Sequence, residues 1–121
     1  MTGANGGLGS YVTKALLDAG ANVVGVSRKI QQSDFPSSSF TALPVEISNA
    51  GAKDMVDSVV DRLGRRDVVV HTVGGFDGGQ SIAETDDATF QSMFDLNLNS
   101  TFYLLRAVLP VICGANYLAG Q

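Results

Sequence analysis

Short apolar runs alternate along this chain with stretches in which apolar residues recur at helical spacing. The runs are predicted as strands at Ala21–Ser27, Phe40–Ile47 and Asp67–Thr72, and the last of these, DVVVHT, is the strongest strand signal in the sequence. Strands that are apolar throughout are typical of a parallel sheet covered by helices on both faces. The alternation therefore predicts a doubly wound α/β architecture of three layers.

The intervening stretches predict helices by the spacing of their apolar residues. One face of the first helix holds Leu8, Val12, Ala15, Leu16 and Ala19. The second helix follows a cap at Ser48 or Asn49, ends at Gly64, and buries Met55, Val56, Val59, Val60 and Leu63. A long third helical region follows a cap at Thr85 or Asp86, and its predicted inward residues are Phe90, Met93, Phe94, Leu104, Leu105 and Val108.

Length and composition limit what the chain can be and what it can bind. At 121 residues, 45% hydrophobic and 17% charged, it is predicted to form one domain over residues 1–121. A net charge of −4 argues against nucleic acid and an anionic membrane as partners, because both require a positive surface. Residues 102–115 are apolar but too short to span a membrane, and we recognise no signal peptide. With Cys113 as the single cysteine, we expect a cytoplasmic protein.

Glycine is concentrated near the start, where Thr2–Gly9 reads TGANGGLG. Without Cβ atoms a turn can be tight, and its backbone can approach a pyrophosphate that the N-terminal N–H groups of the next helix attract. The run resembles the Thr-Gly-x-x-x-Gly-x-Gly fingerprint of the short-chain dehydrogenase/reductase family. The resemblance implies a Rossmann-like fold, and the alternative is a glycine-rich loop without a ligand. The cofactor-binding residues that it implies here are Gly3, Asn5, Gly7, Leu8 and Gly9.

Two residues at the end of the Ala21–Ser27 strand, Ser27 and Arg28, bear on the choice of cofactor. In a dinucleotide-binding sheet the adenosine ribose lies at this position, and an acidic residue there favours a free 2′-hydroxyl. This chain has no acidic residue here, and the Arg28 guanidinium can pair with a 2′-phosphate instead. We therefore predict NADP rather than NAD, and the alternative is a solvated arginine at a strand end.

The resemblance continues at two further strand ends. Glu46 and Ile47 resemble the family's Asp-Val pair, which contacts the adenine ring. His71–Gly74 stands where the family usually has Asn-Asn-Ala-Gly, and the resemblance places Val73 and Gly74 in the cofactor site. The glycines over residues 74–79 resemble the dihydropteridine-reductase-like branch. His71 is interpreted as a strand histidine with satisfied hydrogen bonds, and no cluster of His and Cys predicts a metal site.

Asn97 lies in a segment, Asp95–Phe102, that resembles the family's asparagine-containing helix. In the family that asparagine helps to hold a water that connects the catalytic lysine to solvent, so the resemblance assigns Asn97 a catalytic role. Helical spacing places it on the inward face, and a helix asparagine satisfied locally is the alternative. The helix Leu98–Ile112 is predicted to join copies of the chain into a homo-oligomer, because in the family it packs against a partner subunit.

The family's catalytic Tyr-x-x-x-Lys pair has no counterpart in this sequence. Tyr117 is followed four places later by Gln121. The lysines, none with a tyrosine four places before it, are Lys14, Lys29 and Lys53. We expect a chain truncated at both ends, which lacks the first strand and the C-terminal half. Three interpretations stay open: a fragment of an NADP-linked oxidoreductase of carbonyls or alcohols, a dinucleotide-binding protein without turnover, and a folded remnant that persists as an oligomer.

Overall fold

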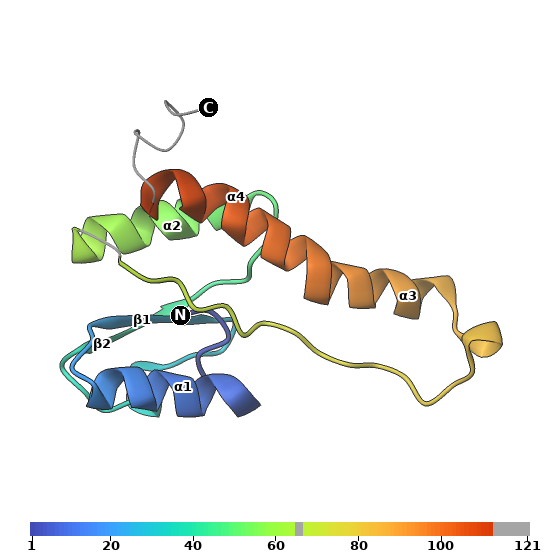
Figure 1. Ribbon diagram of the computed structural model, residues 1–121, viewed down its shortest axis with the longest axis horizontal. Helices are drawn as coiled ribbons and strands as arrows, with labels where there is room; N and C mark the ends of the chain where they lie inside the picture. The colour runs from blue at the N-terminus through green and yellow to red at the C-terminus, as the bar shows by residue number, and fades with distance from the viewer. Residues whose placement is uncertain (65–66, 113–121) are drawn as a thin grey trace.

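The computed structural model describes residues 1–64 and 67–112 of the chain. Its helices are α1 (Gly7–Asp18), α2 (Gly51–Leu63), α3 (Asp87–Phe94) and α4 (Ser100–Ile112), and its strands are β1 (Val23–Ser27) and β2 (Phe40–Pro44). The shorter helical turns are η1 (Gln32–Asp34), η2 (Ile82–Glu84) and η3 (Asp95–Asn99), a π-helical turn between α3 and α4. α1 lies on one side of the strands, and α2 and α4 lie on the other (Figure 1). The predicted three-layer α/β fold is confirmed.

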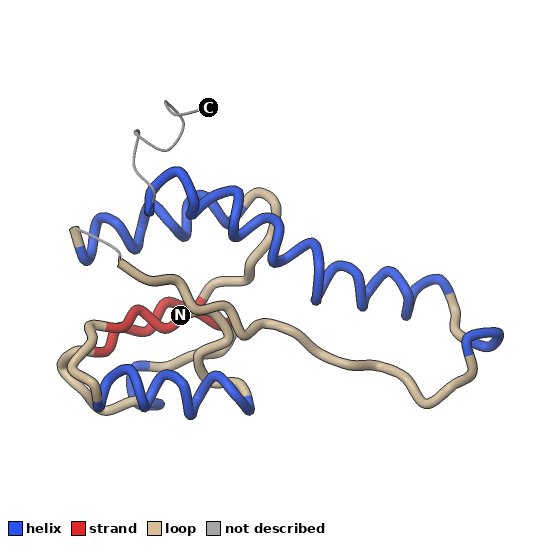
Figure 2. Tube along the Cα trace, in the orientation of Figure 1, coloured by secondary structure: helices blue, strands red, loops and turns tan. Residues whose placement is uncertain are grey.

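The sheet is parallel, and hydrogen bonds on both sides of β1 set its order. β1 pairs with β2 in register from Val23–Phe40 to Ser27–Pro44. On its other side, Thr2 bridges both Val26 and His71. The backbone therefore runs in the order β2, β1, residues 1–3 and residues 67–72. Figure 2 shows the two strands, in red, between the helices of the outer layers.

Residues 67–72 do not form the regular strand that their apolar run predicts. They make a single bridge, because the backbone beside them consists of residues 1–3 and offers few groups to pair with. The N–H of Thr2 donates to the Val70 carbonyl at 2.9 Å, and the N–H of Thr72 donates to the Thr2 carbonyl at 3.1 Å. A β-branched run becomes a strand only where another backbone satisfies its hydrogen bonds.

β1 and β2 are both shorter than the predicted strands. The ladder starts at the Val23–Phe40 pair and ends at Pro44, which has no N–H to donate. One further bond, from the Val45 N–H to the Ser27 carbonyl at 3.2 Å, closes the pairing. The strand predicted over residues 45–47 is therefore wrong.

Two apolar clusters lie between the layers. The larger one, between the sheet and the α2–α4 layer, is made of Val24, Val26, Leu43, Met55, Val56, Leu104 and Val108. The smaller one, toward α1, is made of Ala4, Val23, Ile30 and Phe40. The inward face predicted for α2 is confirmed, and Gly64 ends that helix in the left-handed conformation with φ 69°. Leu104, with 1% of its surface exposed, is the central residue of the α4 contact.

α1 is anchored by small buried residues, and of the apolar face that its sequence predicts, Leu16 packs against the smaller cluster. Gly9 and Thr13 are its buried residues, and the Thr13 hydroxyl donates to the Ala4 carbonyl at 3.1 Å. Leu8, which the spacing places on the same face as Leu16, is 69% exposed and does not pack into the core. Because successive helical positions differ by about 100°, a helix that buries Gly9 turns Leu8 outward.

α3 projects away from the layered body (Figure 1), and this overturns the inward positions predicted for its aromatic residues. Phe90 is 58% exposed and Phe94 is 43% exposed, because the one described element that α3 contacts substantially is η3. Leu105, on the outer side of α4, is likewise exposed and not inward. The start of α3 is as predicted, since the Asp86 side chain accepts the N–H of Thr89 at 2.7 Å.

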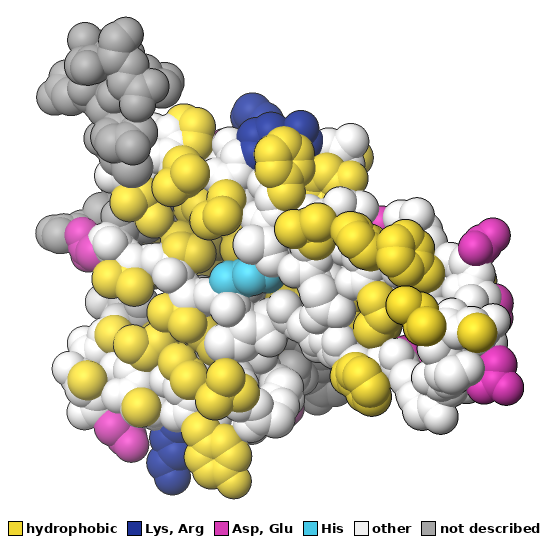
Figure 3. Space-filling model, turned by 45° about the vertical axis from the view of Figure 1, so that its right-hand side comes forward, with side chains coloured by type: hydrophobic (Ala, Val, Ile, Leu, Met, Phe, Trp, Pro, Cys, Tyr) yellow, Lys and Arg dark blue, Asp and Glu magenta, His cyan; other side chains and the backbone are white. Residues whose placement is uncertain are grey.

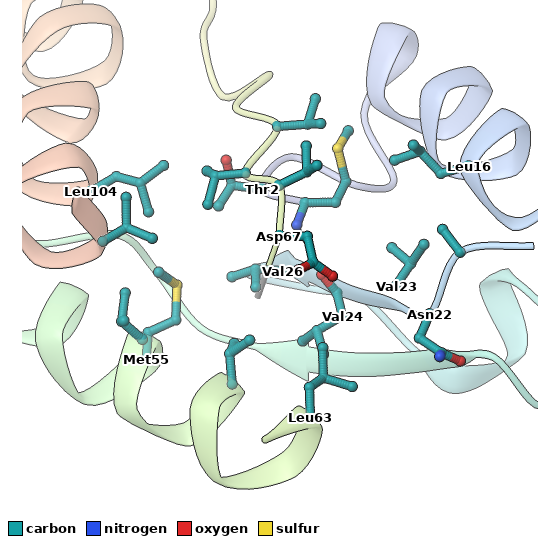
Figure 4. A pocket seen from close by; sticks show the side chains of 18 of the residues that line it. Thr2, Leu16, Asn22, Val23, Val24, Val26, Met55, Leu63, Asp67 and Leu104 are labelled. Atoms are coloured by element: carbon teal, nitrogen blue, oxygen red, sulfur yellow. The ribbon is translucent and has the colours of Figure 1, made fainter. Parts of the chain in front are cut away.

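A cavity of about 470 Å³ lies between β1, α2 and residues 67–70. Its lining is mainly aliphatic, with Val24, Val26 and Met55 on one side and Leu16 on the other, and Asn22 stands near it (Figure 4). The cavity is near the amino ends of the parallel segments, and none of the residues predicted to bind a dinucleotide lines it. In the described part of the chain, no helix combines the length and apolar character of a membrane span.

Candidate functional site

The predicted site residues follow four extended segments that run in the same direction. The glycine turn follows Thr2, Arg28 follows β1, Glu46 comes two residues after β2, and Val73 follows residues 67–72. Because parallel segments end at one edge of a sheet, the structure brings these positions to that edge, where α/β folds bind their ligands.

The glycine turn is folded tightly on itself. Gly3 has φ 69°, and a Cβ on it would lie 2.8 Å from the Thr72 hydroxyl oxygen. A Cβ on Gly9 would lie only 1.8 Å from the Gly3 carbonyl oxygen, which also accepts the Gly6 N–H at 3.0 Å. Two glycines are therefore required by packing inside the turn itself, whether or not a ligand binds.

Gly7 is different, because a Cβ built on it meets no atom within 4 Å. The first intrahelical bond of α1 runs from the Ser10 N–H to the Gly6 carbonyl at 2.9 Å. The N–H groups of Gly7, Leu8 and Gly9 thus precede the helical ladder, and no side-chain hydrogen bond caps this end of α1. Donors without helical partners, together with the open space beside Gly7, suit an anion, which the helix dipole also favours.

The residues beside the turn reach solvent. Asn5 is exposed, and its side-chain amide donates to the Asp34 carboxylate at 3.3 Å, which connects the turn to η1. Arg28 is exposed, and within residues 1–64 and 67–112 no carboxylate forms an ion pair with it. Glu46 is exposed and Ile47 is half-buried against the larger apolar cluster. An exposed arginine that is not held by the described carboxylates can pair with an external anion.

Asn97 holds the segment that follows residues 67–72. Its side-chain oxygen accepts the Gly75 N–H at 3.0 Å, while its amide donates to the Gly75 carbonyl at 2.9 Å and to the Met93 carbonyl at 3.0 Å. It is exposed and not on an inward face as predicted, because η3 lies beyond the sheet. Its local satisfaction matches the alternative that the sequence left open. π-Helical turns of this kind are frequent at functional sites.

His71 is hydrogen-bonded on both ring nitrogens, which confirms its interpretation as a satisfied histidine. Nδ1 lies 2.7 Å from the Thr2 hydroxyl and Nε2 lies 2.9 Å from the Thr101 hydroxyl. Burial lowers the pKa of the imidazole below its usual 6.5, which favours the neutral ring at neutral pH. The next residue, Thr72, donates its hydroxyl to the Thr2 carbonyl at 2.9 Å and is 3.3 Å from the Gly3 carbonyl. The sequence did not predict the roles of Thr72 and Thr101, since neither hydroxyl belongs to a recognised motif.

A metal site is not predicted by the sequence, and the positions of the described side chains bear on this. Within residues 1–64 and 67–112, no group of three or more His, Cys, Asp or Glu side chains is placed to hold a metal ion. Cys113, Tyr117 and Gln121 lie outside the described residues.

Comparison with known proteins identifies a matching family and relatives that are longer than this chain. A family model described as short chain dehydrogenase matches residues 1–117. An uncharacterized oxidoreductase of Staphylococcus epidermidis is 30% identical over 119 residues, which cover 93% of this chain and 50% of the relative. A 7alpha-hydroxysteroid dehydrogenase of Bacteroides fragilis is 30% identical over 129 residues, covering 93% of this chain and 47% of the relative. The chain therefore spans about half the length of these curated relatives.

Solved structures share the fold. Serine dehydrogenase from Escherichia coli matches with a TM-score of 0.84 at 22% identity, over 92% of this chain and 54% of that one. ElxO with NADP bound matches with a TM-score of 0.79 at 21% identity, over 85% of this chain and 45% of that one. A short chain dehydrogenase from Leptospira borgpetersenii with bound NAD⁺ matches with a TM-score of 0.77 at 22% identity, over 88% of this chain and 42% of that one. Since the family model matches nearly the whole chain and the neighbours share its layers, this chain belongs to the short chain dehydrogenase family.

Proposed function

We propose that residues 1–121 form the dinucleotide-binding part of a short-chain oxidoreductase that acts on a carbonyl or an alcohol. The observation that carries the proposal is the open space at Gly7, in front of α1 N–H groups that precede the helical ladder. A pyrophosphate fits this position, because it requires close backbone approach and unpaired donors. A bound nicotinamide dinucleotide would supply hydride-transfer chemistry.

The chain's own residues divide into three roles in this proposal. Gly3 and Gly9 shape the turn, since a side chain on either would collide with backbone or with Thr72. The N–H groups at Gly7 and Leu8 face the anion. The positions toward the adenine, carried over from the family resemblance, are Glu46 and Ile47. Val73, Gly74 and Asn97 border the far part of the same edge, and a branch similar to the dihydropteridine reductases stays a prediction.

Arg28 supports a preference for NADP over NAD. It is exposed, pairs with no carboxylate among the described residues, and directly follows β1. Structural neighbours of the chain hold NADP in one case and NAD⁺ in another, so the preference is argued from Arg28 and not from them. An ion pair with a 2′-phosphate is worth about 1–3 kcal/mol, or roughly 5- to 150-fold in affinity.

Turnover is a separate matter from binding. These 121 residues contain no Tyr-x-x-x-Lys sequence, which provides the proton relay of the family. We therefore propose that this polypeptide, assayed alone, binds the dinucleotide without NAD(P)H-dependent reduction of carbonyl or quinoid pterin substrates. A cytoplasmic location, predicted from the single cysteine, belongs to the same proposal.

Titration of the purified chain with NADPH and NADH tests the binding proposal. NADPH is expected to bind more tightly, and Arg28→Ala is expected to remove that preference, whereas Lys29→Ala removes the same charge one residue away and should retain it. Gly7→Asp is expected to abolish binding of both cofactors, because its carboxylate would enter the anion position. An acidic residue in the first turn favours the helix, so this loss would not reflect unfolding. Failure of the wild-type chain to bind either cofactor would refute the proposal.

A second candidate function is favoured by the outer face of α3 and α4. Exposed apolar side chains follow one another along these helices and η3 at Phe90, Phe94, Leu98, Phe102, Leu105 and Leu109. Figure 3 shows hydrophobic side chains gathered over much of the visible face, including the end that carries α3. Patches of this kind mark association surfaces more often than free monomer surfaces. We infer that the chain forms a homo-oligomer through the helix Leu98–Ile112, and light scattering tests it.

A further inference from the structure

A directed line of hydrogen bonds passes through His71. The Thr101 hydroxyl donates to the Asn97 carbonyl at 3.1 Å, so its one hydrogen is used. Its oxygen must then accept from Nε2–H of His71, 2.9 Å away. In the neutral ring Nδ1 is therefore bare, and it accepts the hydroxyl hydrogen of Thr2 at 2.7 Å. The network thus assigns the Nε2–H tautomer to His71.

One end of this line holds the glycine turn. The Thr2 side chain is buried with 3% of its surface exposed, and His71 is its side-chain partner. Thr72, adjacent to His71, holds the Thr2 carbonyl, and the next carbonyl, that of Gly3, is the atom against which Gly9 packs. Thr2 therefore begins a series of contacts that leads through Thr72 and Gly3 to the N-terminus of α1.

The other end of the line leads through Thr101 and Asn97 to Gly75. Thr101 fixes the Asn97 carbonyl within η3, and the Asn97 side chain pairs with both backbone groups of Gly75. His71 consequently lies between the two parts of the candidate site, and it contacts each through a hydroxyl.

We propose that His71 is a positioning residue that keeps the glycine turn and the Asn97–Gly75 contact in one arrangement, and that it sets the affinity for a dinucleotide through both. The proposal rests on the proposed dinucleotide binding for its second part. His71 does not border the open space at Gly7, so it acts through Thr2 and Thr101. The ring suits this task because one nitrogen donates and the other accepts, with a rigid plane between them.

Amide hydrogen exchange on the complete chain without cofactor, followed by NADPH titration, tests the proposal. His71→Leu keeps apolar bulk but removes both bonds, and it is expected to speed exchange at Gly75 and Gly6 and to weaken NADPH binding roughly 10-fold. His71→Asn retains a donor and an acceptor and is expected to restore both readouts to within about threefold of wild type. Thr101→Val, which keeps the ring, should speed exchange at Gly75 more than at Gly6.

The double variant His71→Leu/Thr101→Val separates coupling from simple loss of stability. If the two residues act through each other, the double variant should bind NADPH about as weakly as His71→Leu alone. Additive losses, or unchanged exchange at Gly75 and Gly6 in His71→Leu, would overturn the proposal. If His71→Leu does not fold, Thr101→Val and His71→Asn still decide through their exchange at Gly75. If the wild type binds no dinucleotide, the proposed function fails, while the exchange data continue to test the coupling.

Discussion

The glycine turn and the α3 helix are held in opposite ways. Ala4 of the turn and Thr13 of α1, which donates to the Ala4 carbonyl, are fully buried, and the Gly9 backbone lies directly against the Gly3 carbonyl. α3 has no buried residue, and its two phenylalanines pack on each other, with ring centroids 4.7 Å apart. The shape of the turn follows from contacts within this chain, whereas α3 is supported by its cap, its helical propensity and the continuous η3–α4 run.

This difference shows which part of the structure depends on a partner surface for its stability. An isolated helix as short as α3 is marginal in water, and in proteins its stability comes from burying an apolar face. The apolar face of α3 is present but exposed, so its packing depends on a partner surface. The turn needs no such partner, and its remaining open space is at Gly7.

The largest contrast is expected between two leucines on one continuous helical run. Leu104→Ala should lower the free energy of unfolding by about 2–5 kcal/mol, because it leaves a cavity in the larger apolar cluster. Leu98→Ala, at a side chain that is 55% exposed, should change it by less than about 0.5 kcal/mol. Urea unfolding at low protein concentration measures both. A loss of several kcal/mol for Leu98→Ala would mean that η3 is covered in solution.

A second test asks what covers the outer face of α4. Replacing both Leu105 and Leu109 by Ser should convert an oligomer to a monomer, since each large apolar side chain buried in an interface contributes about 1.5–3 kcal/mol. Ile82→Ser is the matched control, because Ile82 is equally apolar and 95% exposed but lies on η2. Light scattering at micromolar concentration reports the mass. A wild-type chain that is a stable monomer would contradict the association and the contrast drawn from it.

A third test separates the two kinds of glycine in the turn. Gly9→Ala should lower the free energy of unfolding by about 1–3 kcal/mol, because the new Cβ would overlap the Gly3 carbonyl. Gly7→Ala should leave stability unchanged or raise it by up to about 1 kcal/mol, since alanine favours the helix and its Cβ meets nothing. Equal destabilisation by the two substitutions would contradict the packing role assigned to Gly9.

The same contrast separates what the sequence could predict from what it could not. The layers and the glycine turn were predictable, because apolar runs, helical spacing and the glycines of Thr2–Gly9 are local signals. The failed strand at residues 67–72 was not, since a run of valines does not reveal how much backbone lies beside it. The outward Leu8 was missed because Gly9 and Thr13, which fix the rotation of α1, are not counted as apolar. The His71–Thr101 bond joins residues 30 positions apart, and no spacing rule reaches that far.

The smallest expected effect is a pH dependence of the free energy of unfolding that arises from His71, next to the glycine turn. Burial lowers the pKa of His71 below 6.5, so as pH falls below 6.5 the unfolded chain takes up a proton before the folded chain does. The free energy of unfolding should therefore be insensitive to this residue above pH 6.5 and decrease as pH falls toward the lowered pKa. The buried amino group of Met1, whose pKa is lowered from 8.0 to about 6, acts in the same direction between pH 8 and 6.

Urea unfolding of wild type and His71→Asn between pH 8 and 5.5 separates the two contributions, because both chains share that of Met1 and one lacks the imidazole. Ordinary carboxylates titrate below this range. A wild-type curve parallel to that of His71→Asn below pH 6.5 would show that folding does not lower the pKa of the imidazole, and the support of the turn would then be assigned to Thr72, Thr13 and the backbone bonds.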